Sequence, residues 1–246
     1  MIVENSEAKR AERFGAIVDL ALTAWAQRWP LYLVIALASI AIEYPAALLA
    51  HYDETIAGII AACVDGLAMA FVSLDVAARF SEHERSLREL AAKALRRWPL
   101  VAFLFVEISL MQGLVAPGLF GSPEQTLYGI LILPTLAVFG FFGVVTVVAS
   151  IDESTPQLAL LFYAIYRSVA CAAAWPNLGR LTVAGAMVAV PIMLQTLLQQ
   201  WLASRGFAAG PAFFWANIPV DALCVAPFQA FFTYLYLDFM VREQRR

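Results

Sequence analysis

Four acidic side chains of this chain stand inside long apolar segments, where an ionised carboxylate is costly. They are Glu43, Asp65, Glu107 and Asp221, and no Lys or Arg lies at comparable depth in those segments. In hydrocarbon such a group stays protonated, faces water or binds something, because the ionised form costs at least a few kcal/mol. Asp65 and Glu107 form the deeper pair and are the candidate intramembrane proton or cation site.

The same carboxyl groups have a structural interpretation, which the sequence leaves open. A protonated carboxyl can donate a hydrogen bond to a neighbouring helix, and an acid near the outer interface needs no further role. Glu43 and Asp221 lie toward the ends of their segments, where this interpretation costs least.

Two aspartates are each followed by an arginine four residues later, Asp75 by Arg79 and Asp238 by Arg242. Aspartate before arginine at this spacing is the favourable order on a helix. We interpret both as interfacial ion pairs that fix the cytoplasmic ends of their helices, since surface pairs are usually modest and local. At the third related position, Asp152 is followed by Pro156 in place of arginine.

Enzymatic motifs are missing from the chain. It has no Gly-x-x-x-x-Gly-Lys loop, no His-Glu-x-x-His and no Gly-x-Ser-x-Gly. Three cysteines lack Cys-x-x-Cys spacing and the two histidines are far apart, so we expect no metal and no cofactor. No nucleic-acid-binding module is present either. The sequence therefore predicts a protein that is not an enzyme.

Composition indicates which elements must position these residues. The chain is 62% apolar and 14% charged, against roughly 25% charged residues in soluble domains. Runs of about 20 apolar residues can span a bilayer, and in hydrocarbon such runs are helices. We predict six spans, at residues 31–50, 56–78, 99–116, 126–150, 178–203 and 212–241.

A Trp-Pro dipeptide recurs three times, each time where a partly charged segment gives way to an apolar one. A short motif ending in aspartate closes the apolar stretch after each copy. This periodicity predicts three two-helix pseudo-repeats, at about 8–80, 81–153 and 154–246, within one integral membrane domain covering 1–246. The dipeptides are Trp29-Pro30, Trp98-Pro99 and Trp175-Pro176, and the closing motifs are Ser73-Leu74-Asp75, Ser150-Ile151-Asp152 and Tyr236-Leu237-Asp238.

Each Trp-Pro is preceded by a segment that we expect to form a helix on the cytoplasmic face, here called the leading helix of its repeat. In the second repeat, Ser86 and Glu89 fit a capping box at its start. Its apolar positions share one face, the pattern of a helix lying in the headgroup plane, with Trp29, Trp98 and Trp175 as interface anchors. The apolar positions are Leu87, Leu90, Ala91, Ala94, Leu95 and Trp98, and the charged positions assigned to the other face are Arg85, Arg88, Glu89, Lys93, Arg96 and Arg97.

Two departures from the simple pattern matter for the fold. The third leading segment, residues 156–175, is nearly all apolar, so it either packs against the bundle or dips into the membrane. In the second span Ala62, Gly66 and Ala70 form a face of small residues, which predicts close packing against another helix.

The basic residues give an orientation. Of the 16 Lys and Arg residues, Arg205 alone falls on one side of the six predicted spans, which leaves 15 on the other. Cytoplasmic loops carry the excess of basic residues, so both termini are expected in the cytoplasm. Anionic lipid headgroups are the expected partners of these arginines.

Two stretches resemble one bacterial group. Ser86-Leu87-Arg88-Glu89-Leu90-Ala91 with Trp98-Pro99-Leu100, and the run from Thr233 to Glu243 after Pro227, are similar to the six-helix membrane domain fused to some glycerophosphodiester phosphodiesterases and to related stand-alone inner-membrane proteins. The phosphodiesterase domain is absent here, so its activity is not implied. The resemblance implies a stand-alone, multi-pass protein of the bacterial inner membrane.

The sequence as a whole predicts an all-α, polytopic membrane protein with six transmembrane helices in three pseudo-repeats, each preceded by a leading helix. The expected function is that of a scaffold, an accessory subunit of a membrane-protein partner or homo-oligomer, or a lipid organiser. The alternative is a small transporter or lipid-handling protein that uses Asp65 and Glu107. A polar cavity reaching Glu107 would favour transport, and a solid core would oppose it.

Overall fold

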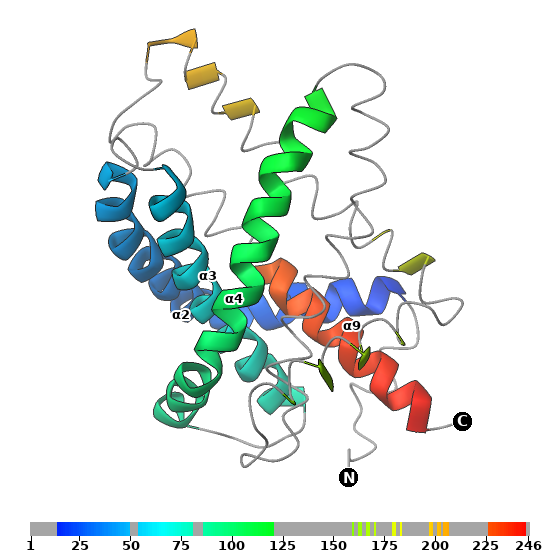
Figure 1. Ribbon diagram of the computed structural model, residues 1–246. Helices are drawn as coiled ribbons and strands as arrows, with labels where there is room; N and C mark the ends of the chain where they lie inside the picture. The colour runs from blue at the N-terminus through cyan, green and yellow to red at the C-terminus, as the bar shows by residue number, and fades with distance from the viewer. Residues whose placement is uncertain are drawn as a thin grey trace.

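The computed structural model describes residues 14–49, 54–80, 86–120 and 226–244, and short pieces between residues 159 and 206. Within that part the regular elements are helices, and no strand occurs. The long helices are α2 (Phe14–Leu49), α3 (Glu54–Phe80), α4 (Leu87–Phe120) and α9 (Ala226–Gln244), as Figure 1 shows. The predicted all-α class is confirmed for these residues.

The helices coincide with the apolar segments. α2 covers the predicted span 31–50 except its last residue, α3 contains 56–78, and α4 contains 99–116. α9 covers the second half of 212–241 and continues to Gln244. The predicted span 126–150 lies outside the described residues, as does most of 178–203.

One stretch in the described part of the chain, Gly15–Ile42, is long and apolar enough to cross a membrane. Few of its side chains are buried within the protein. The stretch includes both the leading helix of the first repeat and the beginning of the first predicted span.

α2 contains a corner where the sequence places the first Trp-Pro. Arg28 is non-helical, with φ −124° and ψ 20°, and separates the leading helix from the part that follows. Pro30 is the cause, because it lacks an N–H to bond the carbonyl four residues back and its ring crowds that carbonyl. The expected corner is therefore present in the first repeat.

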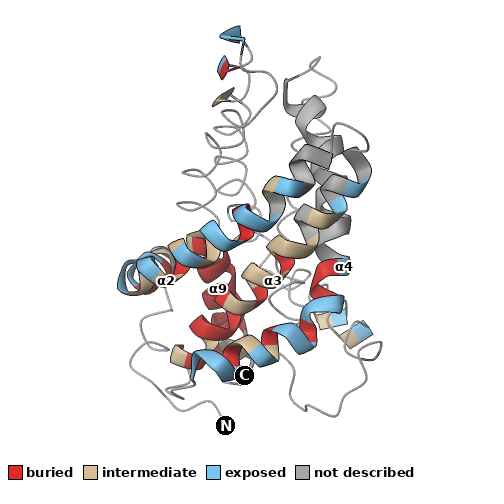
Figure 2. Ribbon diagram, turned by 90° about the vertical axis from the view of Figure 1, so that its left-hand side faces the viewer, coloured by how far each residue is buried: buried red, intermediate tan, exposed pale blue. Residues whose placement is uncertain are grey.

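The second Trp-Pro behaves differently. α4 continues as one helix through Trp98 and Pro99 to Phe120. Figure 2 shows that its first third runs across the molecule before the helix turns upward. Leu90 and Ala94 before the proline and Val101 after it join the same core cluster of α3 and α4. Packing on both sides of Pro99 thus keeps the helix continuous through its change of direction.

The start of α4 confirms the capping box and corrects the face assigned to one arginine. The backbone N–H of Ser86 donates to the Glu89 carboxylate at 3.1 Å, and the Glu89 N–H donates to Ser86 Oγ at 3.3 Å. Leu90 and Ala94 are buried, but Leu87 and Leu95 are about half exposed. Arg97, expected on the charged outer face, is instead 3% exposed. The buried row of this helix consists of residues 90, 94, 97 and 101. It is rotated about the helix axis relative to the predicted apolar face, so Leu87 and Leu95 are exposed and Arg97 is buried.

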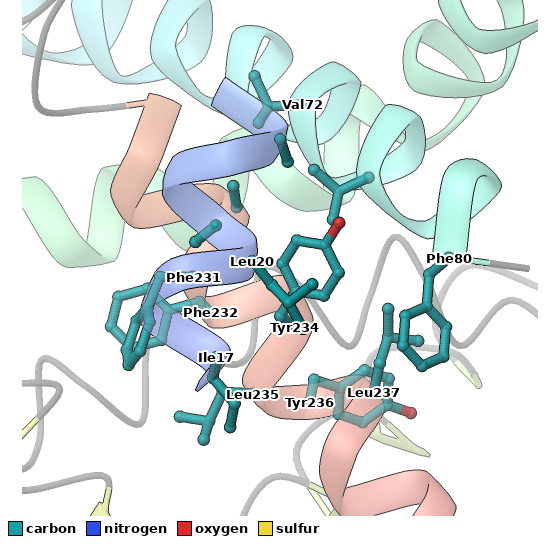
Figure 3. Close-up of a cluster of buried hydrophobic side chains, with 14 of the residues drawn as sticks. Ile17, Leu20, Val72, Phe80, Phe231, Phe232, Tyr234, Leu235, Tyr236 and Leu237 are labelled. Atoms are coloured by element: carbon teal, nitrogen blue, oxygen red, sulfur yellow. The ribbon is translucent and has the colours of Figure 1, made fainter. Parts of the chain in front are cut away.

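The main core surrounds α9. Every residue from Gln229 to Phe239 is buried, which is the behaviour expected of a helix that is covered on all sides. α2 contributes Ile17 and Leu20, and α3 contributes Val72 and Phe80 (Figure 3). The Phe80 ring meets Tyr234 edge to face, with ring centroids 6.1 Å apart. α9 is therefore the centre against which α2 and α3 pack.

α3 and α4 approach closely at the small-residue face. A Cβ added to Gly66 would lie 3.3 Å from the backbone N and Cα of Ala102. Ala70, one turn further on, is 1% exposed and belongs to the α3–α4 cluster. These contacts confirm, at Gly66 and Ala70, that the face of small residues packs against another helix. The side chain of Ala62 is not among those that the structure describes.

Candidate functional site

The most concentrated polar group in the described structure surrounds Asp75 near the end of α3. The Asp75 side chain is 1% exposed. The Tyr32 hydroxyl donates to its Oδ2 at 2.7 Å, and Arg79 Nη2 lies 3.0 Å from the same oxygen. Arg28 Nη1 lies 3.4 Å from Oδ1. The carboxylate is thus neutralised by two guanidinium groups and also accepts a hydrogen bond from the phenol.

Arg79 joins this carboxylate to both sides of the corner in α2. Its Nη2 donates to the Tyr32 hydroxyl at 2.6 Å, and its Nη1 donates to the Ala24 carbonyl at 3.4 Å. Ala24 lies in the turn before the non-helical Arg28, and Tyr32 lies in the first turn after it. Arg79 therefore contacts both the end of the leading helix and the first turn of the following segment.

Asp238 on α9 is the centre of a second group of the same kind. It is 3% exposed, and Arg180 Nη1 donates to its Oδ2 at 2.8 Å. Arg242, four residues later, donates through Nε to both carboxylate oxygens at 2.9 and 2.8 Å. Each buried aspartate thus has a local arginine and a second arginine that is distant in sequence.

The two predicted ion pairs are present, but their surroundings differ from the prediction. Both aspartates are almost fully buried, and neither is an isolated local surface pair. The i, i+4 spacing identified Arg79 and Arg242. The sequence analysis did not predict the remote partners Arg28, Arg180 and Tyr32. The position of Arg28 directly before the first Trp-Pro was a signal that could have identified it.

A buried polar bridge joins α3 to α9 beside the first group. Gln229 Nε2 donates to Ser73 Oγ at 2.7 Å, and the Thr233 hydroxyl lies 3.3 Å from the same oxygen. Thr233 also donates to the Gln229 carbonyl at 2.8 Å. Ser73 opens the Ser-Leu-Asp motif, so this motif places two polar contacts between helices.

The predicted proton or cation pair falls only partly within the described side chains, so it stays a prediction. Asp65 lies on α3 and is half-buried. Glu107 lies in α4, and its side chain is outside the described side chains, as is that of Glu43; Asp221 lies outside the described residues altogether. Among the residues that are described, no group of three His, Cys, Asp or Glu side chains could hold a metal ion.

The predicted Trp anchors have different environments. Trp29 is 52% exposed on α2. Trp98 is 38% exposed, and its indole N–H donates to the Cys63 carbonyl on α3 at 2.7 Å. Trp98 therefore connects two helices and also presents part of its ring outward. Trp175 lies outside the described residues.

The two aspartate groups connect segments of the chain that are distant in sequence. Their polar atoms are directed at one another, with the aspartates below 4% exposure. Comparison of the chain with protein-family models, with curated proteins and with solved structures finds no match.

Proposed function

We propose that this chain is a non-enzymatic, multi-pass protein of the bacterial inner membrane that acts as a scaffold organising the surrounding lipid. Six spans in three pseudo-repeats, with both termini in the cytoplasm, form the proposed arrangement. In the same proposal the scaffold assembles with a membrane-protein partner or with a second copy of the chain. The sequence resemblance to stand-alone inner-membrane proteins agrees with this proposal.

The observation that carries the proposal is the outer side of α2 after its corner. From Trp29 to Ile42 the sequence contains no charged residue. The exposed side chains in that stretch include Val34 at 62%, Leu37 at 44% and Ile42 at 56%. Water-soluble monomers rarely expose continuous apolar surface of this kind, which marks contact with a membrane or another protein.

The buried groups support a scaffold over a transporter. Asp75 and Asp238 are each engaged by two arginines, and Ser73, Gln229 and Thr233 bond one another. A transport site needs ionisable groups that exchange a proton or ion with water. The transporter alternative therefore depends on the predicted pair Asp65 and Glu107.

The membrane arrangement is tested by alkaline extraction of cell membranes and by paired reporters fused after Arg246. One reporter is active only in the cytoplasm and the other only in the periplasm. Retention in the alkaline pellet with a cytoplasmic signal is expected, because 15 of the 16 basic residues fall on one side of the six proposed spans. Release from the pellet, or a periplasmic signal alone, would contradict the arrangement.

The choice between scaffold and transporter is tested in proteoliposomes by proton and monovalent-cation flux. We expect the wild-type protein to show no flux above empty vesicles. Flux that disappears in Asp65→Asn or Glu107→Gln, with folding retained, would replace the scaffold with the transporter.

A further inference from the structure

We propose that the leading helix of the second repeat, residues 87–98 of α4, is a docking surface for anionic phospholipid. This inference rests on the proposed membrane function and assigns lipid selectivity to one of the two described leading helices. The ligand chemistry is a phosphate headgroup with acyl chains attached.

The helix has three sides with different chemistry. One side packs on α3 through Leu90 and Ala94, and the buried Arg97 lies in the same row. The neighbouring side is an exposed apolar strip that contains Leu87 at 48%, Leu95 at 55% and Trp98 at 38% exposure. An apolar strip beside a fixed, buried side is how an interfacial helix meets the acyl boundary.

Arg88 borders this strip, because it lies seven residues before Leu95 and therefore on nearly the same line of the helix. Arg96 is eight residues after Arg88, about 12 Å along the axis and about 80° further round the helix. Both arginines are exposed. Cationic side chains at the edge of an apolar strip are positioned for headgroup phosphates while the strip faces acyl chains.

The neighbouring carboxylate does not cancel this charge at the strip. Glu89 is directed at the start of the helix, where its Oε2 accepts the Ser86 backbone N–H at 3.1 Å. Its return bond, from the Glu89 N–H to Ser86 Oγ, completes the capping box. Glu89 is thus engaged at the start of the helix, and the exposed guanidinium groups of Arg88 and Arg96 complement an anionic lipid surface.

The first repeat supplies an internal comparison. Aligning Trp29 with Trp98 shifts the numbering by 69 residues, and the strip positions Val18, Leu22 and Ala26 then match Leu87, Ala91 and Leu95. Leu22 and Trp29 are 51% and 52% exposed, so the first repeat also presents apolar side chains here.

The charges at the matching positions are different. Asp19 stands where the second repeat has Arg88, and Gln27 stands where it has Arg96. Asp19 and Gln27 are exposed, as are their arginine counterparts. The apolar strip is thus common to the two helices, whereas exposed arginines stand at these two positions only on the second of them, so selectivity for anionic lipid is assigned to α4.

The test exchanges these positions between the repeats. Native mass spectrometry of the detergent-purified full chain measures retained phosphatidylglycerol against phosphatidylcholine offered in equal amounts. The variants are Arg88→Asp with Arg96→Gln, and Asp19→Arg with Gln27→Arg. Arg205→Gln, an exposed arginine outside both helices, serves as the single-charge control. Circular dichroism melts establish that each variant is folded.

Wild-type protein should prefer phosphatidylglycerol, and the preference should weaken as salt is raised. An arginine near an anionic surface is worth about a five-fold change in binding, so the α4 double variant should lower the preference at least about ten-fold. The α2 double variant should raise it, and Arg205→Gln should leave it unchanged. A folded α4 variant that keeps the wild-type preference, or an equal loss in Arg205→Gln, would overturn the assignment.

This outcome is separable from failure of the proposed function. If the chain left the alkaline membrane pellet yet lost phosphatidylglycerol preference in the α4 variant, the docking surface would stand and the multi-pass arrangement would fall. If it stayed in the pellet and the α4 variant kept its preference, the lipid surface would fall and the membrane arrangement would stand.

Discussion

The groups around Asp75 and Asp238 share one construction and use it differently. In both, a buried aspartate is joined to the arginine four residues later and to a second arginine distant in sequence. Around Asp75 the strongest contacts are to Arg79 and Tyr32, and the remote Arg28 is the longest at 3.4 Å. Around Asp238 the remote Arg180 is as close as the local arginine, at 2.8 Å.

This difference shows which long-range contact each aspartate stabilises. Asp75 and Arg79 hold a proline corner in α2 through the Ala24 carbonyl and the Tyr32 hydroxyl, so Arg28 itself contributes little. At Asp238 the connection to another segment runs through the guanidinium of Arg180. Local pairs that look alike in sequence therefore support different long-range contacts.

The largest expected effect is removal of the Asp75 carboxylate. Asp75→Ala leaves the part-buried Arg79 without its carboxylate partner and takes the acceptor from the Tyr32 hydroxyl. Breaking a buried ion pair from one side costs about 3–5 kcal/mol, and we expect Asp75→Ala to fall in that range. Thermal unfolding in detergent, followed by circular dichroism, measures it. Asp238→Ala is the matched comparison, and it should cost about 1 kcal/mol less because no phenol is orphaned there; the reverse order would break the comparison.

The second prediction concerns Arg180. Its side chain is 19% exposed and bonds Asp238 at 2.8 Å. Hydrogen bonds to charged groups contribute about 1.5–3 kcal/mol, so Arg180→Gln should destabilise the protein by about 1–2 kcal/mol after its partial exposure is taken into account. Chemical denaturation in a fixed detergent gives the value. A change below that of Arg28→Gln would show that Arg180 is not the principal remote partner.

Sequence patterns were sufficient for the helices and for the local half of each polar group. Apolar run length located α2, α3 and α4, and i, i+4 spacing located Arg79 and Arg242. The remote partners could not be predicted, because they depend on how helices pack in three dimensions. Arg97 shows the same limit: its charge predicted an outward face, whereas the packing of α4 on α3 buries it.

The third prediction isolates the phenol that distinguishes the two groups. Tyr32→Phe removes one hydroxyl that donates to Asp75 and accepts from Arg79, with the ring retained in a site 1% exposed. We expect a loss of about 1–2 kcal/mol, measured by the same thermal unfolding. Tyr166→Phe, at a tyrosine that is 72% exposed, should change stability by less than about 0.5 kcal/mol. Equal losses of stability in the two variants would mean that the Tyr32 hydroxyl does not stabilise the group around Asp75.

The smallest effect is expected for Arg28, although it stands at the corner itself. Its side chain is 39% exposed and its contact with Asp75 is 3.4 Å, so solvent screens the pair. Exposed pairs contribute about 0.2–1 kcal/mol, and Arg28→Gln should cost no more than this, with a difference from wild type that shrinks at high salt. The corner should persist, because Pro30 removes one helical hydrogen bond and crowds the preceding turn whatever residue precedes Trp29. A spin label on each side of the corner would report its geometry in the variant. Straightening of α2 in Arg28→Gln would mean that the ion pair, rather than the proline, sets the corner, and Asp75 would then act through Arg28 after all.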